Sequence, residues 1–342
     1  MRDLSGRSRR NFFKGCLGSA VCAALQAPAQ PVLAPKSRVV VAHDPDLRGA
    51  GAAIDPNRLE ALLDRAILAL AVPATPRSKQ SILAAWRRIA GPEDTVGLKV
   101  NTLGGRGIST SVELVAAVCD RLQQAGVNPA NIIVWDRDTE EMQRGGFSIA
   151  IGGNRVQCYG TDRAGYEDDL SVWGSVGSRL SKILTRASAV LISLPVLKDH
   201  DGAGVTIALK NMYGVIHNPN KYHPNGCDPY VADLNMLPEI RSRLKLVICD
   251  ATTAMYEGGP AFKPEHSWNA NSLILSQDPV ALDFTGWQII ERKRGAMGLK
   301  TLAAEKRAPN YIATAADSDH RLGHNQAGQI AVVETQLTPG GA

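Results

Sequence analysis

The segment from Lys198 to His223 holds the side chains best suited to chemistry in this sequence. It contains three lysines and three histidines but only two acidic residues, and glycine and proline interrupt it repeatedly. A lysine can neutralise an anion or, when buried, exchange a proton, and a histidine can transfer a proton or bind a metal. The segment therefore predicts a site for an anionic ligand, and its candidate catalytic residues are Lys210, His200 and His223.

Lys210 is the strongest of these candidates. Residues 203–213 are predicted to form a short helix in which Thr206 and Lys210, four positions apart, share one face opposite an apolar face. A lysine in that place is either a surface residue whose stem lies along apolar neighbours or a fixed cation with a lowered pKa. The histidines are candidates for proton transfer or for metal binding, and none of them has an HxH or HExxH spacing.

Three predicted strands are followed by polar residues. The strand at 95–100 brings Lys99 and Asn101 to its end, and the strands at 189–194 and 245–249 are followed by further basic, acidic and glycine residues. Because the carboxyl ends of parallel strands share one edge, where ligands bind, we expect these groups to meet in one crevice. The candidate ligand-binding residues are Lys99, Asn101, Lys198, Thr206, Asn211, Lys221, Gly258 and Gly259. The candidate metal ligands are His200, His223 and Asp250.

The elements that position these residues alternate between strands and helices. The strand at 95–100 is followed by a predicted capping box at 110–113, a helix that stops at Gly126, and a strand at 131–135. This order is a βαβ unit, which implies parallel strands and a right-handed crossover. Further strands are predicted at 38–43, 189–194, 245–249, 272–276 and 329–334, and further helices at 56–71, 79–90, 178–186 and 279–292.

The predicted fold is α/β, with a mixed, mostly parallel sheet and helices on both faces. A single domain is expected over residues 38–337. The alternative is a division into two lobes near residues 140–190, where the chain is rich in glycine, arginine and aspartate. The side chains expected to line one cavity at the edge of this sheet are Lys99, His200, Lys210 and Asp250.

The first residues indicate export by the twin-arginine (Tat) pathway. Residues 8–14, SRRNFFK, precede a weakly apolar stretch and a small-residue site near Ala29, as in a twin-arginine signal peptide. We therefore expect a signal peptide over 1–29, a proline-rich linker over 30–37, and a periplasmic or otherwise exported protein with the Tat translocase as a partner. This pathway carries folded proteins, so a metal ion or cofactor inserted before export is an open expectation.

Charge and hydropathy argue against two other classes of protein. The formal net charge is +5, but the leader carries five basic residues and one acidic residue, so the chain beyond residue 29 is near +1. Nucleic-acid binding needs a concentrated positive excess and is not expected. No run of eighteen apolar residues follows the leader, so stable membrane insertion is not expected either.

Four cysteines follow the leader, at positions 119, 158, 227 and 249. Their spacing matches no ferredoxin or CxxC pattern, so a ferredoxin-type iron–sulfur cluster is not expected. Cys119 and Cys249 lie in apolar segments and are predicted to be buried thiols. Whether Cys158 and Cys227 form a disulfide in an oxidising periplasm is left open by the sequence.

Together these motifs resemble a bacterial and archaeal family described as domain of unknown function 362, over most of the chain beyond the leader. Some relatives carry ferredoxin-type clusters, for which this chain lacks the cysteines. The matching motifs are K-x-N at 99–101, P-x-x-K-x-H at 195–200, T-x-x-x-K-N-x-x-G at 206–214, K-x-H at 221–223, an acidic strand end followed by GGP, and D-P-V-A-L-D at 278–283.

The segment around Lys210 is also similar to the nickel-pincer lactate racemase family. In that family a histidine precedes by ten residues a lysine that is joined to the cofactor, and a downstream histidine ligates nickel. His200, Lys210 and His223 stand in the same order. The catalytic histidine that the family carries further upstream has no counterpart here. The resemblance implies racemase- or epimerase-like chemistry at this segment.

Three functions are open from the sequence. The first is an exported enzyme whose Lys/His/Asp site binds a small anionic molecule or a cofactor. The second is a periplasmic protein that binds such a ligand without changing it. The third is a metal-dependent oxidoreductase, racemase or epimerase whose metal is bound by histidine and aspartate. The sequence does not specify the substrate, the reaction or the oligomeric state.

Overall fold

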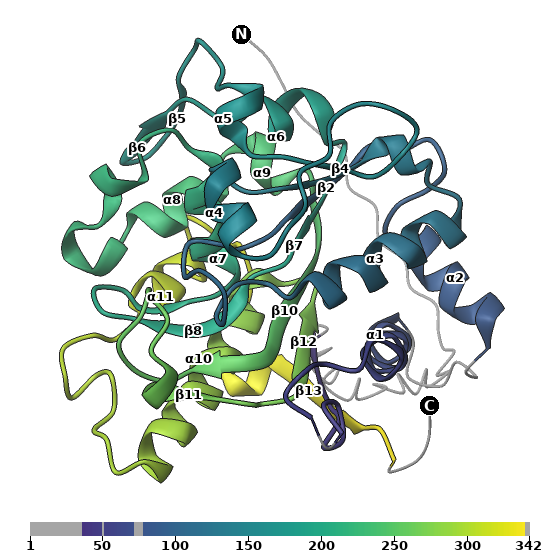
Figure 1. Cartoon of the computed structure of the whole chain (residues 1–342). Coiled ribbons are helices and arrows are strands. Elements are labelled where there is room, and N and C mark those ends of the chain that lie inside the picture. Colours follow the sequence, from purple (N-terminus) through teal and green to yellow (C-terminus); the bar gives the residue numbers. More distant parts are fainter. Residues whose placement is uncertain (1–35, 50, 72–77, 339–342) are drawn as a thin grey trace, which may run out of the picture. The chain divides into compact units, whose positions relative to one another are not determined.

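The computed structural model describes residues 36–49, 51–71 and 78–338, all of which belong to one compact unit. The signal peptide predicted over 1–29 and most of the predicted linker lie outside these residues. Within the described chain, eleven strands form one mixed, mostly parallel sheet that has helices on both faces (Figure 1). The predicted α/β fold is confirmed.

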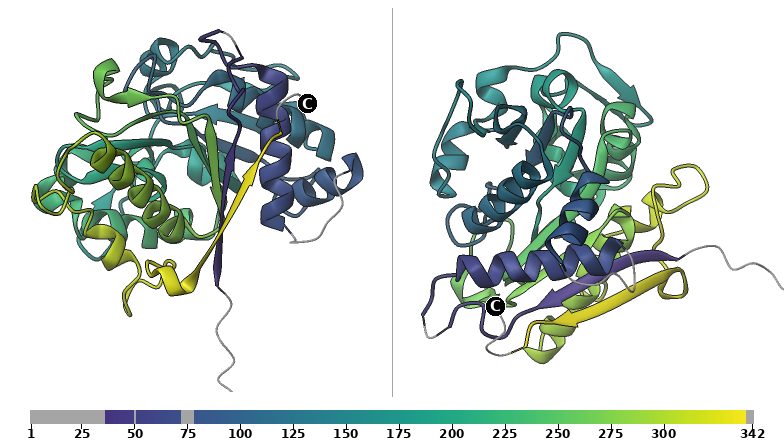
Figure 2. Two further views of the ribbon diagram at one scale, coloured as in Figure 1. Left: turned by 90° about the horizontal axis from the view of Figure 1, so that it is seen from below. Right: turned by 90° about the vertical axis from the view of Figure 1, so that its right-hand side faces the viewer.

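Eight of the described strands form the main path of the sheet. In chain order they are β1 (Ser37–His43), β2 (Val96–Lys99), β3 (Ile132–Trp135), β4 (Gln157–Cys158), β7 (Val190–Ser193), β10 (Leu244–Met255), β12 (Ser272–Ser276) and β13 (Ile330–Gln336). Their spatial order is β13-β1-β12-β10-β7-β2-β3-β4. Neighbours from β10 to β4 are parallel, β12 is antiparallel to both of its neighbours, and β13 lies parallel beside β1 (Figure 2).

Two hydrophobic cores fill the two sides of the sheet. Successive strand residues point to opposite faces, so Val39 belongs to one core and Val40 to the other. One face is covered by α1 (Pro56–Ala71), α2 (Lys79–Arg87) and α3 (Val112–Ala125) (Figure 1). The opposite face is covered by α6 (Lys182–Ala187), α8 (Tyr230–Met236), α9 (Pro238–Arg241), α10 (Pro279–Ala296) and α11 (Tyr311–Ala315).

Two predicted helix starts have different outcomes. Asp278 caps α10 as predicted, because its Oδ1 accepts hydrogen bonds from the backbone N–H groups of Val280 and Ala281. The capping box predicted at 110–113 is wrong. The Ser111 hydroxyl donates instead to Asp250, at 2.6 Å, and makes no side-chain cap.

Short elements fill the chain between β3 and β7. They are α4 (Thr139–Arg144), α5 (Thr161–Ala164) and the hairpin of β5 (Ser171–Trp173) and β6 (Val176–Ser178). The helix predicted at 178–186 begins only at Lys182. Ser178 ends β6, and the Ser181 side chain caps α6 by accepting from the Ile183 N–H.

The helix predicted over 203–213 is wrong. Residues 204–206 form β9 (Gly204–Thr206), antiparallel to β8 (Val196–His200), and the helix α7 (Ala208–Asn211) begins after them. Gly204 has a left-handed φ of 78°, and the three residues that follow it are β-branched and favour extended backbone. Thr206 and Lys210 therefore lie on different elements.

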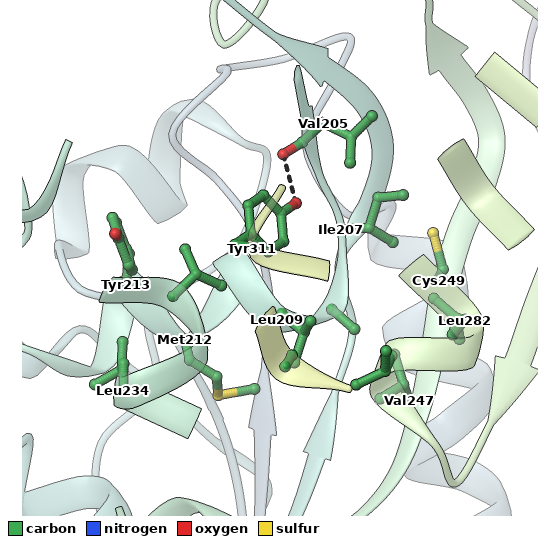
Figure 3. Packing of buried hydrophobic residues seen from close by; sticks show 14 of the residues in the cluster. Val205, Ile207, Leu209, Met212, Tyr213, Leu234, Val247, Cys249, Leu282 and Tyr311 are labelled. Atoms are coloured by element: carbon green, nitrogen blue, oxygen red, sulfur yellow. Dashed lines mark hydrogen bonds between the residues drawn. The ribbon is translucent and has the colours of Figure 1, made fainter. Parts of the chain in front are cut away.

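The hydrophobic core behind α7 fixes this short helix from one side. Figure 3 shows Leu209 and Met212 packed in the same cluster as Leu234 and Leu282. The Tyr311 hydroxyl donates to the backbone oxygen of Val205 at 2.9 Å and so attaches α11 to β9. Because the apolar side chains of α7 face this core, its polar side chains are left to face the opposite direction.

Candidate functional site

The hairpin of β8 and β9 presents three of the predicted site residues. Lys198 lies directly opposite Thr206 in the antiparallel register, and His200 lies opposite Gly204. Lys198 and His200 are two positions apart on β8, so their side chains share a face with Thr206. All three line one cavity, which has a volume of about 240 Å³.

Helix α7 supplies Lys210 and Asn211 to the same cavity. Its first turn is held by Asp283 of α10, which is fully buried. The two carboxylate oxygens of Asp283 accept hydrogen bonds from the backbone N–H groups of Ala208 and Leu209, at 2.7 and 3.1 Å. Asp283 thus fixes the backbone immediately before Lys210.

The cavity gathers most of the residues that the sequence nominated, from strand ends, the hairpin and the loops after α7. The predicted residues that line it are Lys99, Asn101, Lys198, His200, Thr206, Lys210, Asn211 and His223. Further lining residues that the predictions missed are Leu103, Asp136, Arg137, Glu141, Tyr213, Gly214, Pro219, Asn220 and Pro260. Asp136 directly follows β3, so the rule that found Lys99 and Asn101 at the end of β2 could also have found it.

Lys99 is a paired cation within the cavity wall. Its ammonium group contacts Asp136 Oδ1 at 2.7 Å, the Val100 carbonyl oxygen at 2.7 Å and Asn211 Oδ1 at 3.3 Å. Asn211 Oδ1 also accepts from the Asn101 amide at 3.2 Å. The charge of Lys99 is therefore neutralised by Asp136, and its hydrogen bond to Asn211 helps to fix the positions of Asn211 and Asn101.

Lys198 and Lys210 form no ion pair with any described residue, although both are buried. The Lys198 ammonium donates to Asn101 Oδ1 at 2.9 Å and to the Pro260 carbonyl at 3.5 Å. Burial lowers the pKa of Lys198 to about 8, with nearby Asp136 opposing and Lys210 adding to the effect. Burial likewise lowers the pKa of Lys210 to about 8.

His223 is the hydrogen-bond partner of Lys210. The Lys210 Nζ lies 3.3 Å from His223 Nε2 and 4.5 Å from the centre of the Tyr213 ring. His223 Nδ1 donates to the Pro219 carbonyl at 3.1 Å, so the Nε2 lone pair faces the lysine. Burial, followed by the charge of Lys210, lowers the pKa of His223 and favours the neutral ring.

His200 stacks near His223, with ring centres 5.8 Å apart. Its Nδ1 accepts backbone N–H bonds from Gly202 and Ala203, at 3.1 and 3.2 Å, which places the proton of the neutral ring on Nε2. Burial, then the charge of Lys210, lowers the pKa of His200 to about 2. His200 is thus a neutral hydrogen-bond donor.

The Thr206 hydroxyl has no hydrogen-bond partner among the described residues. Its oxygen is buried, and the residue as a whole is 6% exposed. Buried polar groups in folded proteins are nearly always satisfied, so an unsatisfied one that lines a cavity indicates a place for a ligand or water oxygen.

Four predicted site residues do not line the cavity. Asp250 is buried, and its carboxylate accepts four hydrogen bonds from the backbone and hydroxyl groups of Ser111 and Thr252, at 2.6 to 2.9 Å. Lys221 is exposed and lies beside the Tyr222 ring. Gly258 and Gly259 belong to the loop after β10, where the Gly259 N–H donates to Asp199, whose side chain alternates away from Lys198 and His200.

The structure does not assemble His200, His223 and Asp250 into a metal-ligand set. Asp250 lies within β10, and its carboxylate accepts the four hydrogen bonds from Ser111 and Thr252. Within the residues described, no group of three or more His, Cys, Asp or Glu side chains is placed to hold a metal ion.

The four cysteines beyond the leader are buried free thiols. Cys158 belongs to the core on the side of α1 to α3, and Cys227 belongs to the core on the other side of the sheet. The sheet separates them, so the disulfide that the sequence left open does not form.

No helix in the described part of the chain has the length and hydropathy to cross a bilayer.

No curated protein matches the chain. The family model described as "Domain of unknown function (DUF362)" matches residues 96–288, from β2 into α10. This match includes every residue that lines the cavity. The chain belongs to the DUF362 family.

Proposed function

We propose that the protein is an enzyme that binds a small anionic substrate and moves a proton on it. Lys198 and Lys210 neutralise the anion, and Lys210 with His223 forms the proton-transfer pair. The observation that carries this proposal is the presence, in one cavity, of two buried ammonium groups that have no carboxylate partner within the described chain. Burying an unpaired charge costs several kcal/mol, which a bound anion would offset.

The balance of charge in the cavity supports an anionic ligand. The lining contains four cations, Lys99, Arg137, Lys198 and Lys210, and two carboxylates, Asp136 and Glu141. Asp136 is paired with Lys99 and Glu141 with Arg137, at 2.7 and 3.3 Å. Two positive charges therefore remain for the ligand.

The volume of the cavity favours a small substrate. Sites for drug-sized ligands typically enclose about 300–1,000 Å³. This cavity, at about 240 Å³, lies below that range. A short-chain carboxylate or a small oxyanion suits it better than a nucleotide does.

The Lys210–His223 pair supports general acid–base chemistry. His223 is held neutral with its Nε2 lone pair toward the lysine, and Lys210 has a pKa of about 8, close to neutral pH. Groups with pKa values near the operating pH exchange protons most efficiently. Proton transfer at the carbon beside a carboxylate is the reaction that the racemase-like order of these residues implies.

We further propose that this enzyme acts outside the cytoplasm after export by the Tat translocase. The twin-arginine motif at residues 8–14 supports this proposal. Cell fractionation of the native host tests it, with an Arg9→Lys, Arg10→Lys double variant as the control. Retention of the double variant and export of the wild type are expected; equal export of both would contradict the proposal.

The proposed function is tested with small carboxylic acids in D₂O. We expect proton NMR to show loss of the C–H signal beside the carboxylate with the wild type and with Lys221→Ala, an exposed lysine outside the cavity. Lys210→Ala and His223→Ala are expected to abolish this exchange. If acids bind but are recovered without exchange, the protein is a binding protein and the enzymatic proposal fails.

A further inference from the structure

We propose that Lys210 is a nucleophile that forms an imine with the carbonyl group of a small oxo acid whose carboxylate is held at Lys198. This inference rests on the proposed anion site and gives it a substrate class and a covalent step. It is independent of the order of residues shared with the racemase family, because it depends on how the three cavity lysines differ from one another.

The surroundings of the three lysines differ in their oxygen acceptors. Lys99 Nζ contacts three oxygens, including that of Asp136, and Lys198 Nζ contacts two. Lys210 Nζ contacts no oxygen of the described residues; its partners are the Nε2 atom of His223 and the face of the Tyr213 ring. Oxygen acceptors stabilise the ammonium form of a lysine, so among the three lysines the ammonium form of Lys210 is stabilised least.

A nucleophilic lysine must be able to lose its proton inside the site. Lys210 is 6% exposed, and its desolvation by burial disfavours the charged form, an effect that nearby Cys227 opposes. With a pKa of about 8, about a tenth of Lys210 is free amine at pH 7. His223 Nε2, 3.3 Å away, is placed to accept the proton.

The β8–β9 hairpin supplies partners for both ends of an oxo acid. Lys198 provides an ammonium group for the carboxylate, and Thr206 lies opposite it with a hydroxyl that no described residue hydrogen-bonds. His200 also lines the cavity, and its Nε2–H has no hydrogen-bond partner among the described residues. The hydroxyl and the imidazole N–H are donors for the carbonyl oxygen.

The step balances without an oxidant or a reductant. The Lys210 lone pair attacks the carbonyl carbon, and the electron pair of the C=O bond moves to oxygen, which takes up a proton. That proton comes from the nitrogen of the adduct by way of His223, and the second N–H proton follows the same route to the departing hydroxyl group. One water leaves as the C=N bond forms, so the products are the imine and water.

Reductive trapping tests this inference. The protein is incubated with sodium pyruvate and sodium cyanoborohydride, and the intact mass and the proteolytic peptides are then measured. We expect one reduced pyruvate on Lys210 in the wild type and in Lys221→Ala, and at least a tenfold smaller adduct in Lys210→Arg, which keeps the charge. Thermal unfolding and circular dichroism confirm that Lys210→Arg is folded.

Oxalate calorimetry on the same preparations separates the two proposals. Oxalate is a small dianion that has no ketone or aldehyde to trap. If oxalate binds and no pyruvate adduct forms on Lys210, the imine inference is overturned while the anion site stands. If oxalate does not bind and no pyruvate adduct forms on Lys210, both the anion site and the imine inference fail. Equal labelling of Lys210→Arg and the wild type would show that the adduct lies on other lysines and would also overturn the inference.

Discussion

Raising the pH from 7 to 9 is expected to weaken the binding of sulfate by up to about a hundredfold. Sulfate stays a dianion across this range, so any change in affinity belongs to the protein. The two groups responsible are Lys198 and Lys210, each with a pKa lowered to about 8 by burial. Both are charged and unpaired at pH 7, when the anion is attracted most strongly.

The magnitude follows from the fraction of each lysine that carries a proton. With a pKa of about 8, the protonated fraction falls from about nine-tenths at pH 7 to about a tenth at pH 9. Each lysine thus contributes up to about tenfold, or about 1.4 kcal/mol, when the anion binds only the ammonium form. The two charges repel each other, so they titrate as a pair and not at two independent pKa values.

Isothermal titration calorimetry at constant ionic strength measures this effect. Proton uptake is obtained by repeating the titration at pH 8 in buffers of different ionisation enthalpy, and uptake is expected because a bound anion raises both pKa values. Lys198→Met removes one of the two lysines and should weaken sulfate binding and reduce its pH dependence. Lys221→Met should keep the affinity and the pH dependence of the wild type. An affinity that is constant or rises between pH 7 and 9 would refute the reasoning.

Three further predictions concern the groups around the cavity. Lys198→Met is expected to raise the free energy of unfolding at pH 7 by about 1–3 kcal/mol, because a buried unpaired charge is lost together with two modest hydrogen bonds. Urea unfolding should show this gain shrink between pH 8 and 10.5, where the wild-type lysine is already neutral in the folded state but still protonated when unfolded. Asp283→Asn should cost about 1–3 kcal/mol of stability, since one backbone N–H of α7 loses its acceptor, and calorimetry should show weaker oxalate binding because Lys210 is displaced. Asp250→Ala should destabilise the fold by about 2–4 kcal/mol in the same urea assay, because four hydrogen bonds are lost. The affinity of the remaining folded protein for oxalate should be unchanged, because these bonds lie outside the cavity. A large loss of affinity would show that Asp250 contributes to the site.

Most of the sheet could be predicted because its strands are apolar and bounded by clear turns. The strand predicted at 272–276 is β12, and the βαβ unit around α3 forms as expected. The helix predicted at 203–213 failed because an apolar stretch that fits a helical period also fits a strand of three residues followed by one helical turn. Pairing with β8, which the local sequence does not encode, decided between them.

The candidate site could be predicted wherever a strand truly ends at the sheet edge. Lys99 is the last residue of β2, Asn101 follows two positions later, and both line the cavity. Asp250 was misplaced because β10 continues to Met255, which leaves its carboxylate within a strand and not at its end. Lys99 pairs with Asp136, whereas Lys198 and Lys210 have no such partner in the part of the chain that the structure describes. Both findings depend on distances that only the folded chain defines.

A crystal structure of the protein with oxalate is the most direct test of the proposed anion site. Oxalate oxygens are expected within hydrogen-bond distance of the Nζ atoms of Lys198 and Lys210, with a further contact to the Thr206 hydroxyl. Oxalate bound elsewhere, with this cavity occupied by water alone, would contradict the account.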